Sequence, residues 1–421
     1  MFDILSGYLD NGLRVVLHRI ENIRTVACGI WVNQGSKYED NSTSGASHLL
    51  EHILVNRNNK ENPELYSMMK ELSDNGVQYN ASTTKENTSF YFKGMTDNLN
   101  QCIDTLYNIV VKNRRFDDEV IKNEKSIVER EAVSFYSSFN QIKERTSQAL
   151  YGNLDVGRII VGEVNNIRKI QKNQIIELLE KRYVPQNSTL VVVGEINYGE
   201  TLEYIKNKFS LWQDKNIADS EDTIESNPGI YYSTNKNKNA VISIGLRLPL
   251  LSEQEKLSME VATTIIGDPV MGGRLFREIR EKRGLAYNVG AFLNFYQMRG
   301  TLGFTSVSDS DNIVEVVKII RDILEDTIVK GLTEEDVIKA KKAIKTRRLL
   351  DITDIGNQLG FLGKYASNGI LYSLENEIRN IGNVQLENVN SCIRNIINND
   401  NLGMALIGNC DIDSILPVLN F

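Results

Sequence analysis

The chain has little cysteine, proline or histidine: 4 Cys, 6 Pro and 3 His among 421 residues. The cysteines lie far apart and form no C-x-x-C pair, which argues against a disulfide scaffold and against a zinc cluster held by thiolates. We interpret them as small buried hydrophobic residues. The scarcity of proline suits long, uninterrupted helices. Any histidine chemistry must use His18, His48 or His52, and His18 lies in an alternating, strand-like run.

The sequence also lacks an excess of positive charge. Lys+Arg number 48 against Asp+Glu 55, a net charge of −7, which argues against a general nucleic-acid binder. Residues 1–19 lack the basic start and apolar core of a signal peptide, and nowhere do about 18 apolar residues follow one another. We therefore expect a soluble, cytoplasmic protein with no nucleic-acid or membrane partner.

What the chain does contain is an internal repeat. Three segments of the first half recur in the same order in the second half, displaced by 214 to 217 positions (404 less 190, 311 less 97, 335 less 118). The three pairs are residues 190–197 and 404–411, 97–109 and 311–323, and 118–127 and 335–344. We predict two homologous domains, residues 1–210 and 230–421. The polar, acidic stretch between them, residues 211–229, which ends in Pro-Gly, has the composition of a linker.

Within each half, strand-like runs come early and long amphipathic helices follow. This order predicts an α+β fold, in which each domain is a mainly antiparallel sheet with helices packed on one face. The predicted strands are residues 13–18, 25–33, 89–93, 240–246 and 300–306, with one more strand near the end of each half.

The segment Gly45-Ala-Ser-His-Leu-Leu-Glu-His predicts a helix with chemistry on one face. His48 and His52 are four residues apart, which places them about 6 Å apart along the helix axis, where two imidazoles can bind one metal ion. Glu51 can reach the same face and take a proton from a water that the metal activates. This H-x-x-E-H order is the inverted zincin pattern. The alternative is an ordinary pair of helix-face histidines beside a surface glutamate.

Two histidines and one carboxylate would leave zinc an open position for water, as catalytic sites require. With no further histidine in reach, the third ligand should be a carboxylate. Glu124 and Glu131 are seven residues apart and share one face of a predicted helix, whereas Glu129 points about 140° away from Glu124. In the second half Lys341 and Arg348 replace Glu124 and Glu131. That half contains no histidine, so it cannot hold a comparable zinc site; an ordinary solvated helix face is the alternative reading of the two glutamates.

These motifs resemble the pitrilysin/insulinase family of zinc peptidases, in the short two-domain branch that includes mitochondrial processing peptidase subunits and small bacterial members. The resemblance covers nearly the whole chain, through residues 9–16, 29–39, 45–52, 80–88 and 273–287. It implies that Glu131 is the third zinc ligand and that Glu124 orients a histidine ligand. Two departures are Leu49, where the family commonly has Phe, and residues 56–58, which replace Lys-Gly-Thr and affect loop shape and substrate choice.

The resemblance implies two further sites. Asn80 and Ala81 match an edge strand that binds the substrate backbone by strand addition. Arg280 and Tyr287, in the second half, match residues that reach the substrate and the developing oxyanion. On the residues alone, these two would be a salt-bridged helix position and a half-buried tyrosine.

We therefore expect a zinc-dependent metalloendopeptidase that hydrolyses unstructured peptides. The resemblance implies that two chains form a clamshell around an inner chamber, and the presence of both residue sets in one chain favours a homodimer over a heterodimer. One alternative is a non-catalytic, peptide-binding auxiliary subunit of a processing peptidase. Another is a leader-peptide protease for a modified peptide product. The ligand set favours Zn²⁺, although cobalt or manganese would also fit.

Overall fold

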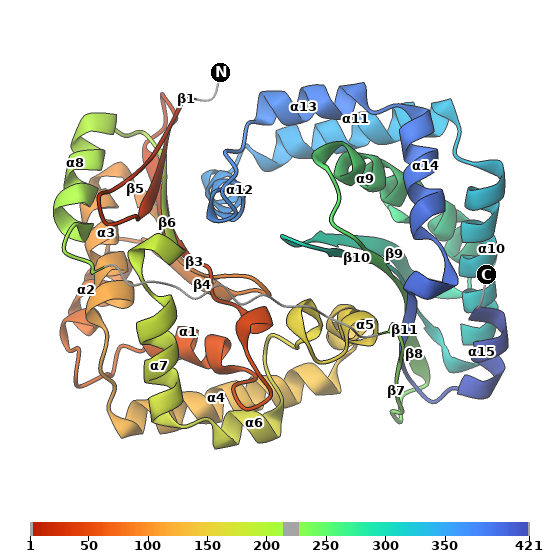
Figure 1. The fold of residues 1–421 in the computed structure, drawn as a ribbon, viewed down its shortest axis with the longest axis horizontal. Helices are drawn as coiled ribbons and strands as arrows, with labels where there is room; N and C mark the ends of the chain where they lie inside the picture. The colour runs from red at the N-terminus through yellow and green to blue at the C-terminus, as the bar shows by residue number, and fades with distance from the viewer. Residues whose placement is uncertain (1–2, 214–226, 420–421) are drawn as a thin grey trace. The chain divides into compact units, whose positions relative to one another are not determined.

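The computed structural model describes residues 3–213 and 227–419 (Figure 1). Residues 214–226 lie outside this range, and with them most of the predicted linker. The described chain divides into two compact units, each with its own sheet. The first unit comprises residues 3–134, 158–213 and 350–374, and the second comprises residues 135–157, 227–349 and 375–419.

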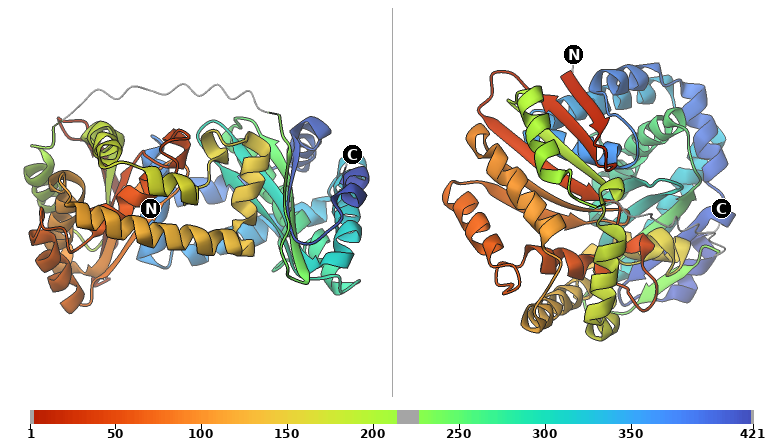
Figure 2. Two further views of the ribbon diagram at one scale, coloured as in Figure 1. Left: turned by 90° about the horizontal axis from the view of Figure 1, so that it is seen from below. Right: turned by 60° about the vertical axis from the view of Figure 1, so that its left-hand side comes forward.

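The first unit contains a six-stranded sheet in the order β1-β2-β6-β3-β5-β4. Its strands, which can be followed in Figures 1 and 2, are β1 (Asp3–Tyr8), β2 (Arg14–Arg19), β3 (Thr25–Val32), β4 (Gln78–Thr83), β5 (Thr88–Met95) and β6 (Ser188–Gly194). Every neighbouring pair is antiparallel except β2 with β6. The strand β4 lies at one edge, so one of its sides is unpaired within the described sheet.

Helices cover both faces of this sheet. Successive strand residues point to opposite faces, so Cys28 and Trp31 of β3 face different layers. Cys28 lies against Cys102 of α3, on the face that also carries α1. Trp31 packs against Gly363 of α12 on the other face. The helices of this unit are α1 (Ala46–Val55), α2 (Glu64–Asp74), α3 (Leu99–Tyr107), most of α4 (Asp118–Ser137), α6 (Val164–Lys169), α7 (Lys172–Arg182), α8 (Tyr198–Phe209) and α12 (Ile355–Ser367).

Within its described residues, the second unit repeats this topology without a counterpart of β1. Its sheet has the order β7-β11-β8-β10-β9, again with a single parallel pair, β11 with β7. The strands are β7 (Ile230–Ser233), β8 (Asn239–Leu248), β9 (Ala286–Phe295), β10 (Gly300–Asp309) and β11 (Leu402–Ile407). Because β6 and β11 carry one of the sequence repeats and occupy equivalent places, the shared topology supports the homology of the two halves.

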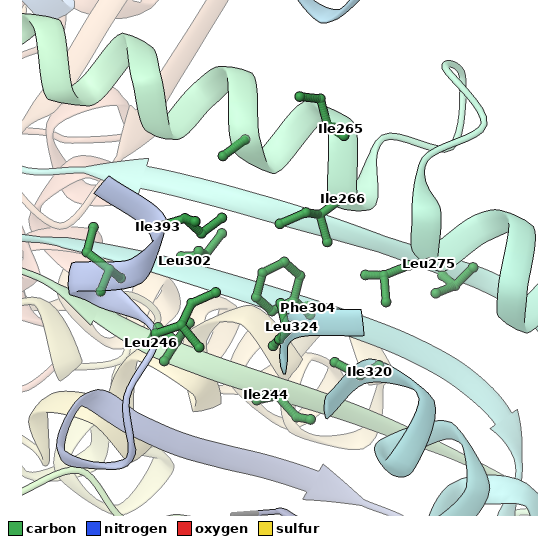
Figure 3. Close-up of a cluster of buried hydrophobic side chains, with 14 of the residues drawn as sticks. Ile244, Leu246, Ile265, Ile266, Leu275, Leu302, Phe304, Ile320, Leu324 and Ile393 are labelled. Carbon is green, nitrogen blue, oxygen red and sulfur yellow. The ribbon is translucent and has the colours of Figure 1, made fainter. Parts of the chain in front are cut away.

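A large apolar cluster joins the second sheet to its helices. Figure 3 shows Leu302 and Phe304 of β10 packed with Ile266 of α9 and Leu324 of α10, all fully buried. On the opposite face, Ile142 of α5 packs against Val241 and other residues of β8 and β11. The helices of this unit are α5 (Ile142–Tyr151), α9 (Glu253–Gly267), α10 (Ile313–Lys330), α11 (Glu334–Asp351), α13 (Leu374–Asn383), α14 (Leu386–Ile396) and α15 (Ile412–Leu419).

The predicted α+β class is confirmed, and each sheet is mainly antiparallel. The prediction placed helices on one face, whereas the opposite face of each sheet carries a helix from the other half of the chain: α12 in the first unit and α5 in the second. The compact units therefore differ from the contiguous ranges 1–210 and 230–421 in these two segments. An amphipathic pattern shows that a helix has an apolar face but does not show which sheet covers it.

The sequence pattern does not predict β1, β7 or β9, because their side chains are largely exposed or irregularly buried and give no clear alternation. Across residues 3–213 and 227–419, no helix combines the length and the apolar character that crossing a membrane requires.

Candidate metal centre

The helix α1 presents an apolar face to the core and a polar face to the candidate centre. Leu49, Leu50 and Ile53 are fully buried. His48 and His52 lie on the other side, with ring centroids 4.8 Å apart and ring planes nearly perpendicular at 87°. The apolar residues occupy one side of α1 and the two histidines the other. Packing of the apolar side into the core therefore holds both imidazoles on one face of the helix.

Glu131 of α4 faces both imidazoles. Its Oε2 atom lies 3.7 Å from Nε2 of His48 and 3.4 Å from Nε2 of His52. One ligand atom from each of the three residues can be chosen so that all lie within 4.8 Å of one another. With bond lengths of about 2.1 Å, neighbouring ligands of a tetrahedral zinc lie about 3.4 Å apart. The three side chains therefore fit a single zinc ion.

Glu124 contacts the far side of the His52 ring. Its Oε2 atom lies 3.2 Å from Nδ1 of His52, and its Oε1 atom accepts a hydrogen bond of 2.5 Å from Nδ2 of Asn56. When Nδ1 carries the ring proton and donates a hydrogen bond to Glu124, Nε2 keeps the free electron pair that binds a metal. Asn56 belongs to residues 56–58, where this sequence departs from the family pattern. Its side-chain amide holds the Glu124 carboxylate through its hydrogen bond to Oε1.

The surroundings of the two histidines shift their pKa values in opposite directions. Burial, and the charge of His52, lower the pKa of His48 to about 4, so this imidazole is neutral at pH 7. Burial also lowers the pKa of His52, but its hydrogen bond with Glu124 and the charges of Glu131 and Glu51 outweigh burial and leave this pKa raised. A neutral His48 suits metal binding, and the acidic cluster around His52 suits a cation.

Glu51 is buried and hydrogen-bonded to the sheet. Its Oε2 atom accepts a hydrogen bond of 2.5 Å from Oγ1 of Thr83, at the end of β4. Burial raises the pKa of Glu51, with the Thr83 hydrogen bond opposing this shift. Sequence reasoning did not single out Thr83, although it lies in the segment that carries Asn80 and Ala81.

Asn80 and Ala81 lie on β4, the edge strand whose end contacts Glu51. The side-chain amide of Asn80 donates to the hydroxyl of Tyr91 at 3.0 Å, and its Oδ1 atom accepts the backbone N–H of Ala81 at 2.9 Å. An edge strand offers backbone groups to an added strand. The position of β4 beside α1 therefore suits the predicted substrate contact.

Arg280 and Tyr287 form a pair within the second unit. Arg280 lies in the last turn of the helical segment Phe276–Glu281, and its guanidinium lies 4.6 Å from the ring centroid of Tyr287 on β9. Tyr287 is 82% exposed. The alternative of a salt-bridged arginine and a half-buried tyrosine is not what the structure shows, because a half-buried Arg280 packs on the exposed Tyr287 ring as a cation–π pair. The predicted role of this pair at the metal centre stays a prediction.

In the second unit, cations occupy the positions that match the two glutamates. Arg348, the counterpart of Glu131, binds Glu260 at 2.7 Å and Glu377 at 2.8 Å. Lys341, the counterpart of Glu124, donates to the carbonyl of Val384 at 2.8 Å. Ion pairs and backbone contacts therefore take the place of a metal site in this half.

Two family models match most of the chain. The model described as "Insulinase (Peptidase family M16)" matches residues 14–163, and the model "Peptidase M16 inactive domain" matches residues 169–344. The two α+β units and the H-x-x-E-H helix agree with these models. The chain belongs to peptidase family M16, the insulinase family. The second model agrees with the absence of histidine from the second half of the sequence.

Known relatives extend along nearly the whole chain. An "Uncharacterized zinc protease" of Mycobacterium leprae is 25% identical over 95% of this chain and 90% of its own length. A protein of Arabidopsis thaliana named "Probable mitochondrial-processing peptidase subunit beta, mitochondrial" is 23% identical over 85% of this chain and 70% of its own length. The crystal structure of a protease from Helicobacter pylori shares the fold, with a TM-score of 0.88 at 17% identity, over 97% of this chain and 100% of that one.

Proposed function

We propose that the protein is a zinc-dependent metalloendopeptidase that hydrolyses unstructured peptides. The observation that carries the proposal is the convergence of His48, His52 and Glu131 from two helices, at spacings that suit one zinc ion. The zinc proteases among the relatives support the same metal. Bound Zn²⁺ supplies Lewis acidity, which polarises a peptide carbonyl and makes water more acidic.

The residues of the chain carry out the remaining steps. Glu51 takes the proton of the attacking water and delivers it to the leaving amine. Thr83 holds the Glu51 carboxylate through its hydroxyl, and Glu124 holds His52 in the tautomer that leaves Nε2 free. Because Glu51 is buried, its carboxylate is a stronger base than one in water.

The substrate backbone binds along the free edge of β4, at Asn80 and Ala81. Binding as an added strand requires extended backbone, so folded proteins are excluded and unstructured segments are accepted. Arg280 and Tyr287 stabilise the negative charge that develops on the scissile carbonyl oxygen. Two chains form a homodimer that encloses this site in an inner chamber. The protein acts in the cytoplasm. The relative named as a mitochondrial-processing peptidase subunit supports peptide processing as the activity.

The deciding experiment compares wild-type protein with the Glu51→Gln variant on quenched fluorescent peptides of unstructured sequence. Wild-type cleavage should stop when a chelator is added and return with zinc. Glu51→Gln should keep bound zinc, measured by elemental analysis, and lose about 10²–10⁴-fold in kcat, because the general base is missing. Undiminished cleavage by the variant would remove Glu51 from this role.

The same assay tests the alternative of an auxiliary subunit. Such a protein would bind the peptides in a fluorescence anisotropy measurement and leave them intact with or without chelator. Molecular mass in solution, at twice the mass of one chain, tests the homodimer.

A further inference from the structure

The start of α1 is capped by a carboxylate from outside the helix. Oε2 of Glu39 accepts the backbone N–H of Gly45 at 2.8 Å, and Oε1 accepts the backbone N–H of Ser47 at 2.7 Å. The first N–H groups of a helix have no partner within the helix, and Gly45 at the N-cap position offers no capping side chain. Glu39 therefore satisfies two donors immediately before His48.

This carboxylate is deeply buried. The Glu39 residue is 7% exposed, and burial raises its pKa to about 7, while the two N–H donors and the charge of Arg158 oppose that shift. Above this pH the carboxylate faces the positive end of the α1 dipole.

The backbone at the start of α1 packs closely against a neighbouring backbone segment. Gly45 has φ of 90°, and a Cβ atom on it would lie 3.0 Å from Cα of Gly162. A Cβ atom on Gly162 would lie 2.5 Å from Cα of Gly45. The side chain of Gln34 donates to Oγ of Ser47 at 2.9 Å. These contacts and the Glu39 cap fix both the position and the rotation of the first turn.

The segment that carries Glu39 is joined to the turn between β4 and β5. The backbone N–H of Lys37 donates to the carbonyl of Lys85 at 2.9 Å, and its ammonium group binds Glu86 at 2.7 Å, with both side chains only 10% exposed. This turn follows directly on Thr83, the hydrogen-bond donor to Glu51. One short segment thus ties the metal-binding helix to the end of the edge strand.

We propose that Glu39 is a positioning residue for the metal centre, since its two-oxygen cap sets the axial position and rotation of α1 so that His48 and His52 face Glu131. This inference rests on the proposed function, because it assigns Glu39 its role through the zinc ligands. Residues 29–39 belong to the family-like segments, and neither the motif nor the proposed mechanism uses the glutamate that ends them.

The test substitutes Glu39→Gln and measures the zinc dissociation constant at pH 8 by competition with a chromogenic chelator. Glutamine has nearly the same shape, but its amide group places a donor opposite one of the two N–H groups. We expect a dissociation constant raised by about 10–100-fold, the range for supports of metal ligands. Peptide cleavage should fall at limiting zinc and recover in excess zinc, which a general loss of stability would not do.

Glu260→Gln is the matched control, because it neutralises a half-buried, ion-paired glutamate of the second unit. It should lower the melting temperature of the zinc-free protein without changing zinc affinity. Should Glu39→Gln fail to fold, Glu39→Asp, which keeps the charge and shortens the reach, takes its place. Wild-type zinc affinity in either folded Glu39 variant would overturn the inference. Tight zinc binding by wild type without cleavage would refute only the peptidase, whereas absence of zinc binding would refute both.

Discussion

Glu124, Glu129 and Glu131 of α4 should respond differently to the same substitution. Glu131 faces both histidines, at 3.4 and 3.7 Å, Glu124 supports His52 from behind, and Glu129 forms an ion pair with Arg168. Replacing each glutamate by glutamine removes one charge with little change of shape. Because only Glu131 is placed as a ligand, Glu131→Gln should weaken zinc binding the most.

The expected size follows from the contacts. Substitutions that disturb the support of a ligand cost about 10–100-fold in metal affinity, so loss of a ligand carboxylate should exceed about 100-fold, or about 2.7 kcal/mol. Zinc at 1,000 times the dissociation constant stabilises the folded protein by about 4.1 kcal/mol, and a 100-fold weaker site retains about 1.4 kcal/mol of this. The zinc-free variant should unfold like wild type, because the Glu131 side chain is 46% exposed.

The assay is thermal unfolding with and without zinc, together with chelator competition. In wild type, zinc should raise the melting temperature clearly, and in Glu131→Gln only slightly. Glu129→Gln is the control on the same helix, since its exposed partner Arg168 lies outside the centre. Zinc affinity retained by Glu131→Gln, or lost equally by Glu129→Gln, would refute the assignment of Glu131 as third ligand.

Three further substitutions test the support of His52 and the packing of α12. Glu124→Gln should weaken zinc binding by about 10–100-fold in the same competition assay, less than Glu131→Gln, because His52 remains in place; equal effects would mean that both glutamates are ligands. Gly363→Ala should destabilise the first unit by about 1–3 kcal/mol in chemical denaturation, because its Cβ atom would lie 2.2 Å from the Trp31 ring. Gly360→Ala on the same helix meets nothing within 4 Å and should instead stabilise it by about 0.5–1 kcal/mol; a loss of stability there would contradict this reasoning.

Much of the fold could be predicted from local patterns. The predicted strand 25–33 corresponds to β3 (Thr25–Val32), and the predicted strand 240–246 lies within β8 (Asn239–Leu248). The helix with His48 and His52 forms as α1, and the helix with Glu124 and Glu131 forms as α4. These elements have strong periodicity, which depends only on the geometry of a few successive residues.

The candidate centre shows where this reasoning stops. A seven-residue spacing places Glu124 and Glu131 on one helix face but cannot choose between them. In the structure, Glu131 approaches Nε2 of both histidines, whereas Glu124 approaches Nδ1 of His52. The resemblance made the same choice, but the geometry supplies its physical reason: the offset of α4 along α1 decides which carboxylate meets which ring nitrogen.

The sequence by itself determined the class of fold, the tandem halves and the histidine pair of α1, because each depends on residues that are near in the chain or repeat within it. Only the tertiary structure decided that α5 and α12 pack on the sheets of the opposite halves, that Thr83 holds Glu51, and that Glu39 caps α1. Burial selects which segments make these contacts, and each buried polar group also needs a hydrogen-bond partner. Both conditions exist only after the chain has folded.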